Sequence, residues 1–275
     1  MNCAIKFLAL LTGASLSLGG LSAYYAPDGQ QAHGEDYIIN VLMGELPYTF
    51  EPEAIRAQAV AARSYLLYCA ETGQSGSTAY ITYDELCERW GKDYADRAYA
   101  AAKAAAYDTA GYVLVWEDEP ALAVWHSSSR VTESSADVWG GDLEYLRPVE
   151  SFEDADAIES AVELTLADAK SRLAEYGYDY DLSDSVGMTL DKAGRCETLT
   201  LGNVTLPGTE ARWVFGLRST DFTVKISDGK LCFRVWGYGH GVGMSQLGAN
   251  ELAKAGYDWR QILAHYYPGC EIAGG

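Results

Sequence analysis

The spacing of apolar residues changes along this chain, from a helical repeat in its first part to strand-like alternation later. Segments 35–46 and 52–71 carry apolar side chains three or four positions apart, and 94–107 is rich in Ala, so all three are predicted as helices. Later segments alternate between apolar and polar residues, and one pair predicts a hairpin around Asp228-Gly229. This order of helices followed by strands predicts an α+β protein.

The other elements are predicted from short patterns and turn residues. Residues 73–82 are predicted as a polar loop, and the acidic turn 117–120 as the link between two strands that bring His126 and the serines 127–129 to a strand end. Strands are predicted at 112–116, 121–126, 162–166, 186–190, 197–201, 205–206, 222–226 and 231–235, and helices at 167–176, 246–255 and 259–265.

The charge balance restricts the kind of partner. The chain has 20 basic and 39 acidic residues, a formal net charge of −19, which repels nucleic acid and anionic membrane surfaces. A polyanionic substrate would also be repelled at long range, so local Arg or Lys side chains would have to hold it. The 20 tyrosines suit sugar rings as well as protein cores, and composition does not separate these uses.

The first residues resemble an export signal. Lys6 precedes an apolar run at 7–18, and Leu21-Ser22-Ala23 is an imperfect cleavage site. Residues 1–23 are therefore predicted to be a signal peptide or a membrane anchor, which makes the protein exported, either secreted or anchored. The alternative is an N-terminal strand or helix that packs into the domain.

The cysteines do not predict a metal site. The six cysteines include no CxxC pair, and no His stands at a metal-ligand spacing. We therefore predict no metal and no cofactor. A disulfide between Cys69 and Cys87 remains open, and most of the thiols are expected to be small buried apolar groups.

Glu45 is the candidate for acid–base chemistry. Ile38, Leu42 and Glu45 share one face of the first helix, and Pro47 ends that helix just beyond the acid. Partial burial and the negative end of the helix dipole both disfavour a charged carboxylate. A proton would then be available near neutral pH, which suits a general acid. The alternative is a solvent-facing glutamate near a helix end.

Two other patterns in the sequence could form sites. The string GYGHGVGMSQLGAN at 237–250 does not predict a nucleotide site, because too few residues follow it and no GK[ST] ending is present. Its glycines still allow His240 and Gln246 to face a cleft, and a packed turn is the alternative. His126 with the serines after it lacks a GxSxG elbow, and no cysteine stands out as a nucleophile.

Three long segments together resemble one family. They are GELPYTFEPEAIRAQAVAARSY at 44–65, WHSSSRVTESSADVWGGDLEYLRPV at 125–149, and the ending from GLRSTDFTV at 216–224 through GYGHGVGMSQLGAN to YYPG at 266–269. In this order they are similar to the stage II sporulation protein D family of peptidoglycan lytic transglycosylases, over about 35–271. The resemblance implies a helical catalytic core, a strand-rich second lobe at about 150–236, and a cleft between them.

The resemblance also implies a substrate and a set of site residues. The substrate is the glycan strand of peptidoglycan, with its stem peptides removed. The family's catalytic glutamate falls on Glu45, and its substrate-binding and cleft-lining motifs fall on Arg63, Tyr145, Arg147, His126, Ser127, Ser128, His240 and Gln246. Arg63 and Arg147 would hold lactyl carboxylates or orient Glu45, with ordinary ion pairs as the alternative.

Two departures from the family pattern stand out. Arg130-Val131 replaces the usual Gly-Gly after the serines, which puts the local loop shape in doubt. The cysteines that bind zinc in some members are absent, which again predicts no metal.

Two other functions remain open. Relatives of the family act as enhancers of separate amidases, so the same cleft could bind glycan without cutting it. An ordinary glycoside hydrolase would need a second carboxylate, such as Glu133 or Asp137. The family's setting implies a membrane complex with a wall hydrolase and a peptide-removing amidase in sporulation, and vegetative wall remodelling is the alternative.

Overall fold

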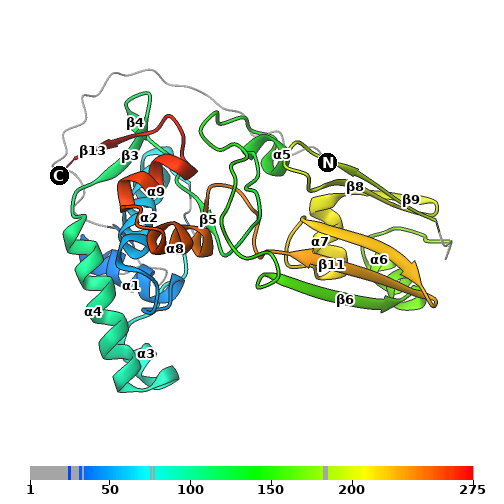
Figure 1. Ribbon diagram of the computed structural model, residues 1–275, viewed down its shortest axis with the longest axis horizontal. Coiled ribbons are helices and arrows are strands. Elements are labelled where there is room, and N and C mark those ends of the chain that lie inside the picture. The colour runs from blue at the N-terminus through cyan, green and yellow to red at the C-terminus, as the bar shows by residue number, and fades with distance from the viewer. Residues whose placement is uncertain are drawn as a thin grey trace.

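The computed structural model describes residues 24–25, 31–32, 34–74, 76, 78–181 and 185–274. A helical lobe and a strand-rich lobe lie side by side along the long axis of the molecule, at the left and right of Figure 1. The predicted α+β class is confirmed. The predicted export segment 1–23 lies outside the described residues, as does much of the chain around the short antiparallel pair β1 (Tyr24–Tyr25) and β2 (Gln31–Ala32). Within the described ranges, no helix is both long and apolar enough to cross a membrane.

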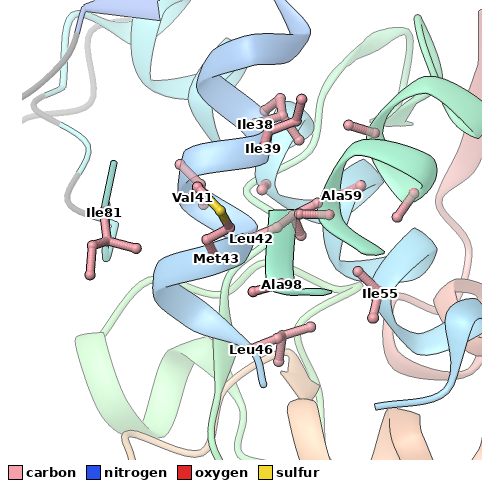
Figure 2. Packing of buried hydrophobic residues seen from close by; sticks show 14 of the residues in the cluster. Ile38, Ile39, Val41, Leu42, Met43, Leu46, Ile55, Ala59, Ile81 and Ala98 are labelled. Atoms are coloured by element: carbon pink, nitrogen blue, oxygen red, sulfur yellow. The ribbon is translucent and has the colours of Figure 1, made fainter. Parts of the chain in front are cut away.

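Three helices form the first core of the helical lobe. α1 (Glu35–Glu45) ends just before Pro47, as predicted, and α2 (Pro52–Thr72) begins with proline at its first turn. α4 (Lys92–Asp108) packs against both. Figure 2 shows how the apolar side chains of α1 meet those of α2 and α4 in this core.

The loop predicted at 73–82 is followed by a helix that was not predicted. α3 (Tyr83–Trp90) begins with a capping box, in which the Thr82 hydroxyl accepts a hydrogen bond from the backbone of Glu85 and the Glu85 carboxylate accepts one from that of Thr82. Leu86 is its one fully buried side chain, and at eight residues the helix spans too few turns for an apolar repeat to be recognised.

The last two helices complete the helical lobe. α8 (Gln246–Lys254) and α9 (Trp259–Tyr266) pack on α2 and form a second core beside it. The small sheet of β3 (Val113–Trp116), β4 (Glu119–Pro120) and β13 (Glu271–Ala273) covers its edge. The prediction of a strand at 121–126 is wrong for most of its length. Only β5 (Trp125–His126) pairs, in parallel with β12 (Met244–Ser245).

The strand-rich lobe contains two antiparallel sheets of three strands. One has the order β10 (Phe222–Ser227), β11 (Lys230–Trp236) and β6 (Glu159–Thr165), which confirms the hairpin at Asp228-Gly229. The other has the order β7 (Val186–Leu190), β8 (Cys196–Leu201) and β9 (Val204–Pro207). Helices α6 (Leu166–Glu175) and α7 (Gly208–Phe215) share one apolar core with them. α7 was not predicted.

Two arginines join the two lobes. Arg195 comes from the turn between β7 and β8, is 1% exposed, and donates from Nη2 to the backbone oxygen of Val131 at 2.7 Å. Its Nε lies 3.5 Å from the Glu133 carboxylate. Arg130 donates through Nε to Asp221 at 2.8 Å. These contacts fix the strand-rich lobe against the segment that follows β5, which also includes the short helix α5 (Ser135–Trp139).

The glycine-rich segment 237–243 passes from β11 to β12 in close contact with that segment. Gly243 has φ 73, and a Cβ built on it would lie 2.1 Å from the backbone oxygen of Val124. No other residue fits this position, because both the backbone angle and the available space exclude a side chain. The close approach permits the parallel pairing of β12 with β5.

We predict that Gly243→Ala lowers the free energy of unfolding by about 2–5 kcal/mol, since it adds a backbone clash to the strain of a left-handed residue. Gly256→Ala is the matched control, because Gly256 has φ 94 with no atom within 4 Å of its Cβ position. It should cost only the backbone part, about 1–2 kcal/mol. Urea unfolding of both variants tests this, and equal losses would contradict the close packing at Gly243.

Candidate functional site

A cleft of about 610 Å³ is lined by residues of both lobes. Its volume lies in the range of small-ligand sites, roughly 300–1,000 Å³. Glu45, Trp125 and Gln246 line it from the helical lobe, and Arg212 and Trp213 line it from α7 of the strand-rich lobe. Among the described residues that line this cleft, Glu45 is the one carboxylate and Arg212 the one guanidinium.

The Glu45 carboxylate is held by three N–H donors. The backbone of Ala79 donates to Oε1 at 2.7 Å, and the Trp125 indole donates to Oε2 at 2.9 Å. The Gln246 amide also donates to Oε2, at 3.2 Å. Glu45 stands in the last turn of α1 and is partly buried, as predicted, but its surroundings are polar rather than apolar. Oε1 accepts one of these bonds and retains a lone pair that can carry a proton.

His126 lies at the end of β5 as a neutral imidazole, and both of its ring nitrogens make hydrogen bonds. Its Nδ1 donates to the backbone oxygen of Val242 at 3.2 Å, so its Nε2 accepts from the Ser129 hydroxyl at 2.8 Å. Burial, aided by the nearby His240 and Arg195, lowers the pKa of His126 well below its ordinary value. His126 lines the cleft, whereas Ser129 is fully buried behind it and does not.

The two serines after His126 differ in position. Ser127 lines the cleft and is partly buried. Ser128 is buried and exchanges backbone hydrogen bonds with Tyr238, at 3.2 and 2.9 Å. Ser128, predicted to contact substrate, therefore holds the glycine-rich segment in place instead of lining the cleft.

His240 lines the cleft in one defined tautomer. Its Nδ1 accepts from the backbone N–H of Val242 at 3.1 Å, which places the proton of the neutral ring on Nε2. Burial lowers the pKa of His240 to about 4, and the charge of Arg212 acts in the same direction. The ring lies 5.2 Å from that of Trp139 between centroids. His240 therefore lines the cleft as a neutral side chain near pH 7.

Exposed aromatic side chains form the rim of the cleft. Trp139, Trp213 and Tyr238 are 47%, 67% and 56% exposed, and all three line it. Large aromatic faces left in water at a cleft suit flat apolar ligand surfaces such as the faces of sugar rings. None of the three was predicted, and Trp213 belongs to a helix that was not predicted either.

Comparison with known proteins gives the same family as the sequence motifs. Residues 29–116 match the family described as stage II sporulation protein. Stage II sporulation protein D of Bacillus amyloliquefaciens is 32% identical over 255 residues, which cover 87% of this chain and 74% of that protein. The protein of the same name from Bacillus subtilis (strain 168) is 33% identical over 257 residues, with the same coverage.

The chain belongs to the stage II sporulation protein D family. The family resemblance drawn from the sequence is therefore confirmed. A second type of relative is the amidase enhancer of Bacillus subtilis (strain 168), which is 26% identical over 288 residues and is covered over 39% of its length.

Besides Ser128, three residues assigned from the family motifs lie away from the cleft. Arg63 is 1% exposed and pairs with Glu35, with Nη2 to Oε2 at 2.6 Å, and its Nη1 donates to the backbone oxygen of Tyr112 at 2.9 Å. Tyr145 is buried, and its hydroxyl accepts from the backbone of Leu122 at 2.9 Å. Arg147 is exposed and does not line the cleft. The ion-pair alternative therefore describes Arg63 in this family member.

The candidates for a second carboxylate also lie outside the cleft. Burial raises the pKa of Glu133 to about 8, against the opposing charge of Arg195. Asp137 is exposed and accepts from the Ser134 hydroxyl at the start of α5. Among the described residues, no group of three or more His, Cys, Asp or Glu side chains is placed to hold a metal ion. The described cysteines, Cys69 and Cys87 among them, are free thiols.

A structural role for Arg63 predicts a stability effect. Arg63→Gln should lower the free energy of unfolding by about 3–5 kcal/mol, because it leaves Glu35 unpaired and removes two bonds to backbone carbonyls. Arg147→Gln, at an exposed guanidinium with no partner in the described part of the chain, should change it little. Chemical denaturation measures both. A stable Arg63→Gln protein that no longer binds glycan would restore the substrate role.

Because the folded protein keeps His240 neutral, we predict that the protein loses stability at low pH. The unfolded imidazole takes up a proton below its ordinary pKa of about 6.5, whereas the folded one does so only near pH 4. Stability that this histidine contributes is therefore lost as pH falls from about 6.5 towards 4, by at most about 1.4 kcal/mol per pH unit. The free energy of unfolding, measured across this pH range, should fall less steeply with decreasing pH in His240→Gln than in the wild-type protein. His265→Gln, outside the cleft, is the control, and equal slopes in all three proteins would refute the assignment.

Proposed function

We propose that this protein is a peptidoglycan lytic transglycosylase. It would cleave the bond between N-acetylmuramic acid and N-acetylglucosamine in glycan strands without stem peptides, and leave 1,6-anhydro ends. The observation that carries this proposal is a single oriented carboxylate, Glu45, in a cleft rimmed by exposed aromatic rings. Membership of a sporulation family supports a role in remodelling the cell wall during sporulation.

One carboxylate is sufficient for this reaction. Glu45 gives its proton to the glycosidic oxygen as the bond from that oxygen to the anomeric carbon breaks. The 6-hydroxyl of the same muramic acid then bonds to the anomeric carbon, and its proton passes to Glu45, which regenerates the acid. No water enters the products, so a second carboxylate that activates water is not needed.

The polar contacts of Glu45 suit both halves of this cycle. The donors from Trp125 and Gln246 fix Oε2, while Oε1 has a free lone pair that can carry the proton and later accept one. An ordinary glycosidase needs two carboxylates on either side of the scissile bond. Glu133 and Asp137 do not line the cleft, which argues against that chemistry.

The test is digestion of purified, peptide-free glycan by this protein alone. The wild-type protein should release fragments with 1,6-anhydro ends, identified by mass spectrometry. Glu45→Gln should lower the rate by about 10²–10⁴-fold, the usual contribution of a general acid–base group. Asp137→Asn removes a carboxylate outside the cleft and should retain full activity. Undiminished product from Glu45→Gln, or reducing ends instead of anhydro ends, would contradict the mechanism.

A second candidate function is that of a glycan-binding enhancer of an N-acetylmuramoyl-L-alanine amidase. The relative named amidase enhancer favours it. The same digest separates the two, because an enhancer binds glycan without producing anhydro ends. Either function fits an exported protein that faces the cell wall and works in a membrane complex with a wall hydrolase and a peptide-removing amidase, with no metal or cofactor of its own.

A further inference from the structure

Arg212 carries an unusual charge in this cleft. Its Nε is shielded from solvent and has no hydrogen-bond partner, and the side chain makes no ion pair within the described residues. Burial lowers the pKa of Arg212, yet a guanidinium starts so high that it remains charged. Its Cζ lies 5.1 Å from the centroid of the Trp213 ring, a cation–π contact, but no carboxylate within the described residues balances its charge. A partly buried cation with an unsatisfied N–H and no carboxylate partner calls for an explanation by function.

The two fully buried arginines of the described residues each have a carboxylate partner. Arg63 pairs with Glu35, and Arg195 with Glu133. In a chain with a net charge of −19, carboxylates are abundant, so a shortage of acidic residues does not explain why Arg212 has no ion-pair partner. Its position on α7 directs it to the cleft, where Glu45 is the one carboxylate, and no ion pair joins the two.

We propose that Arg212 is a specificity-determining residue that binds a free carboxylate of the glycan, while the neighbouring Trp213 supports a sugar face. This inference rests on the proposed glycan substrate. The lactyl carboxylate of muramic acid is a free anion only where the stem peptide has been removed, since it is an amide elsewhere. A guanidinium pairs with a carboxylate through two parallel charged hydrogen bonds, and an amide cannot replace it.

This assignment pairs the lactyl carboxylate of the substrate with Arg212 instead of the arginines of the family motifs. The family motifs assign this role to Arg63 and Arg147, which do not line the cleft. Arg212 does so from the opposite lobe, and its positive charge offsets locally the repulsion that an acidic protein exerts on an anionic strand. An amide-bearing glycan would leave the partly buried guanidinium without a carboxylate partner, which is the basis for rejecting it.

Binding of defined tetrasaccharides tests the proposal. Calorimetry uses Glu45→Gln as background so that no ligand is cut. The ligands are an alternating tetrasaccharide with free lactyl carboxylates, the same tetrasaccharide with each carboxylate converted to its methylamide, and chitotetraose, which has no lactyl group. The background protein should bind the free acid at least tenfold more tightly than the methylamide.

Matched substitutions assign the effect to Arg212. Adding Arg212→Gln should abolish the preference for the free acid, and Arg212→Lys should retain part of it. Arg97→Gln, at an exposed arginine of α4 outside the cleft, removes the same charge and should keep the full preference. Trp213→Ala should weaken all three ligands by a similar factor. Thermal unfolding should show Arg212→Gln at least as stable as its parent, whereas a structural arginine would destabilise it.

The outcomes separate this inference from the proposed function. Equal binding of acid and methylamide, or a preference that survives Arg212→Gln, overturns the inference even if the wild-type protein cuts glycan. A preference that depends on Arg212, in a protein that produces no anhydro ends, supports the inference and refutes the lyase. If Arg97→Gln weakens glycan binding as much as Arg212→Gln does, affinity depends only on the total charge of the protein, and the inference is also overturned.

Discussion

Three hydrogen bonds to the carboxylate of Glu45 connect parts of the chain that are far apart in sequence. Their donors are Ala79, Trp125 and Gln246, which lie 34, 80 and 201 positions further along. The acid has a fixed direction only when the loop before α3, strand β5 and the start of α8 are all in place. The helical lobe can therefore be understood as the support of one side chain. Its two apolar cores hold α1 and α8 on opposite sides of α2, and this spacing brings Gln246 to Glu45.

The strand-rich lobe supplies the other side of the cleft, and its placement depends on polar contacts rather than on a shared apolar core. Arg195 reaches across to Val131 and Glu133, and Arg130 reaches back to Asp221. Buried ion pairs contribute little net stability, but breaking one is costly, so they favour a single arrangement of the two lobes. This explains how Arg130-Val131, the departure from the family's Gly-Gly, is accommodated: both residues bind the second lobe.

Sequence reasoning predicted what local patterns and motif matches encode. It found α1 and α2 from apolar spacing and proline positions, the hairpin at Asp228-Gly229, and the cleft residues Glu45, His126 and Gln246. It missed α3 and α7, which are helices of only eight residues, too short for an apolar repeat to be recognised. It misplaced Arg63, since a motif match gives the position of a guanidinium but not its partner, and the partner Glu35 lies on another helix. Arg212 carried no local signal at all, because its significance comes from its place in the cleft and from the lack of a carboxylate partner among the described residues.

The separation of the two charges in the cleft has a chemical reason. An arginine paired with a carboxylate stabilises its ionised form strongly and would oppose its use as a proton donor. The structure pairs Arg63 with Glu35 instead, and orients Glu45 through neutral N–H donors that add no full positive charge. The two cleft histidines are kept neutral by burial, so they add none either. A cation is still needed to attract an anionic strand to an acidic protein, and placing it on α7 supplies that charge without an ion pair to the proposed acid.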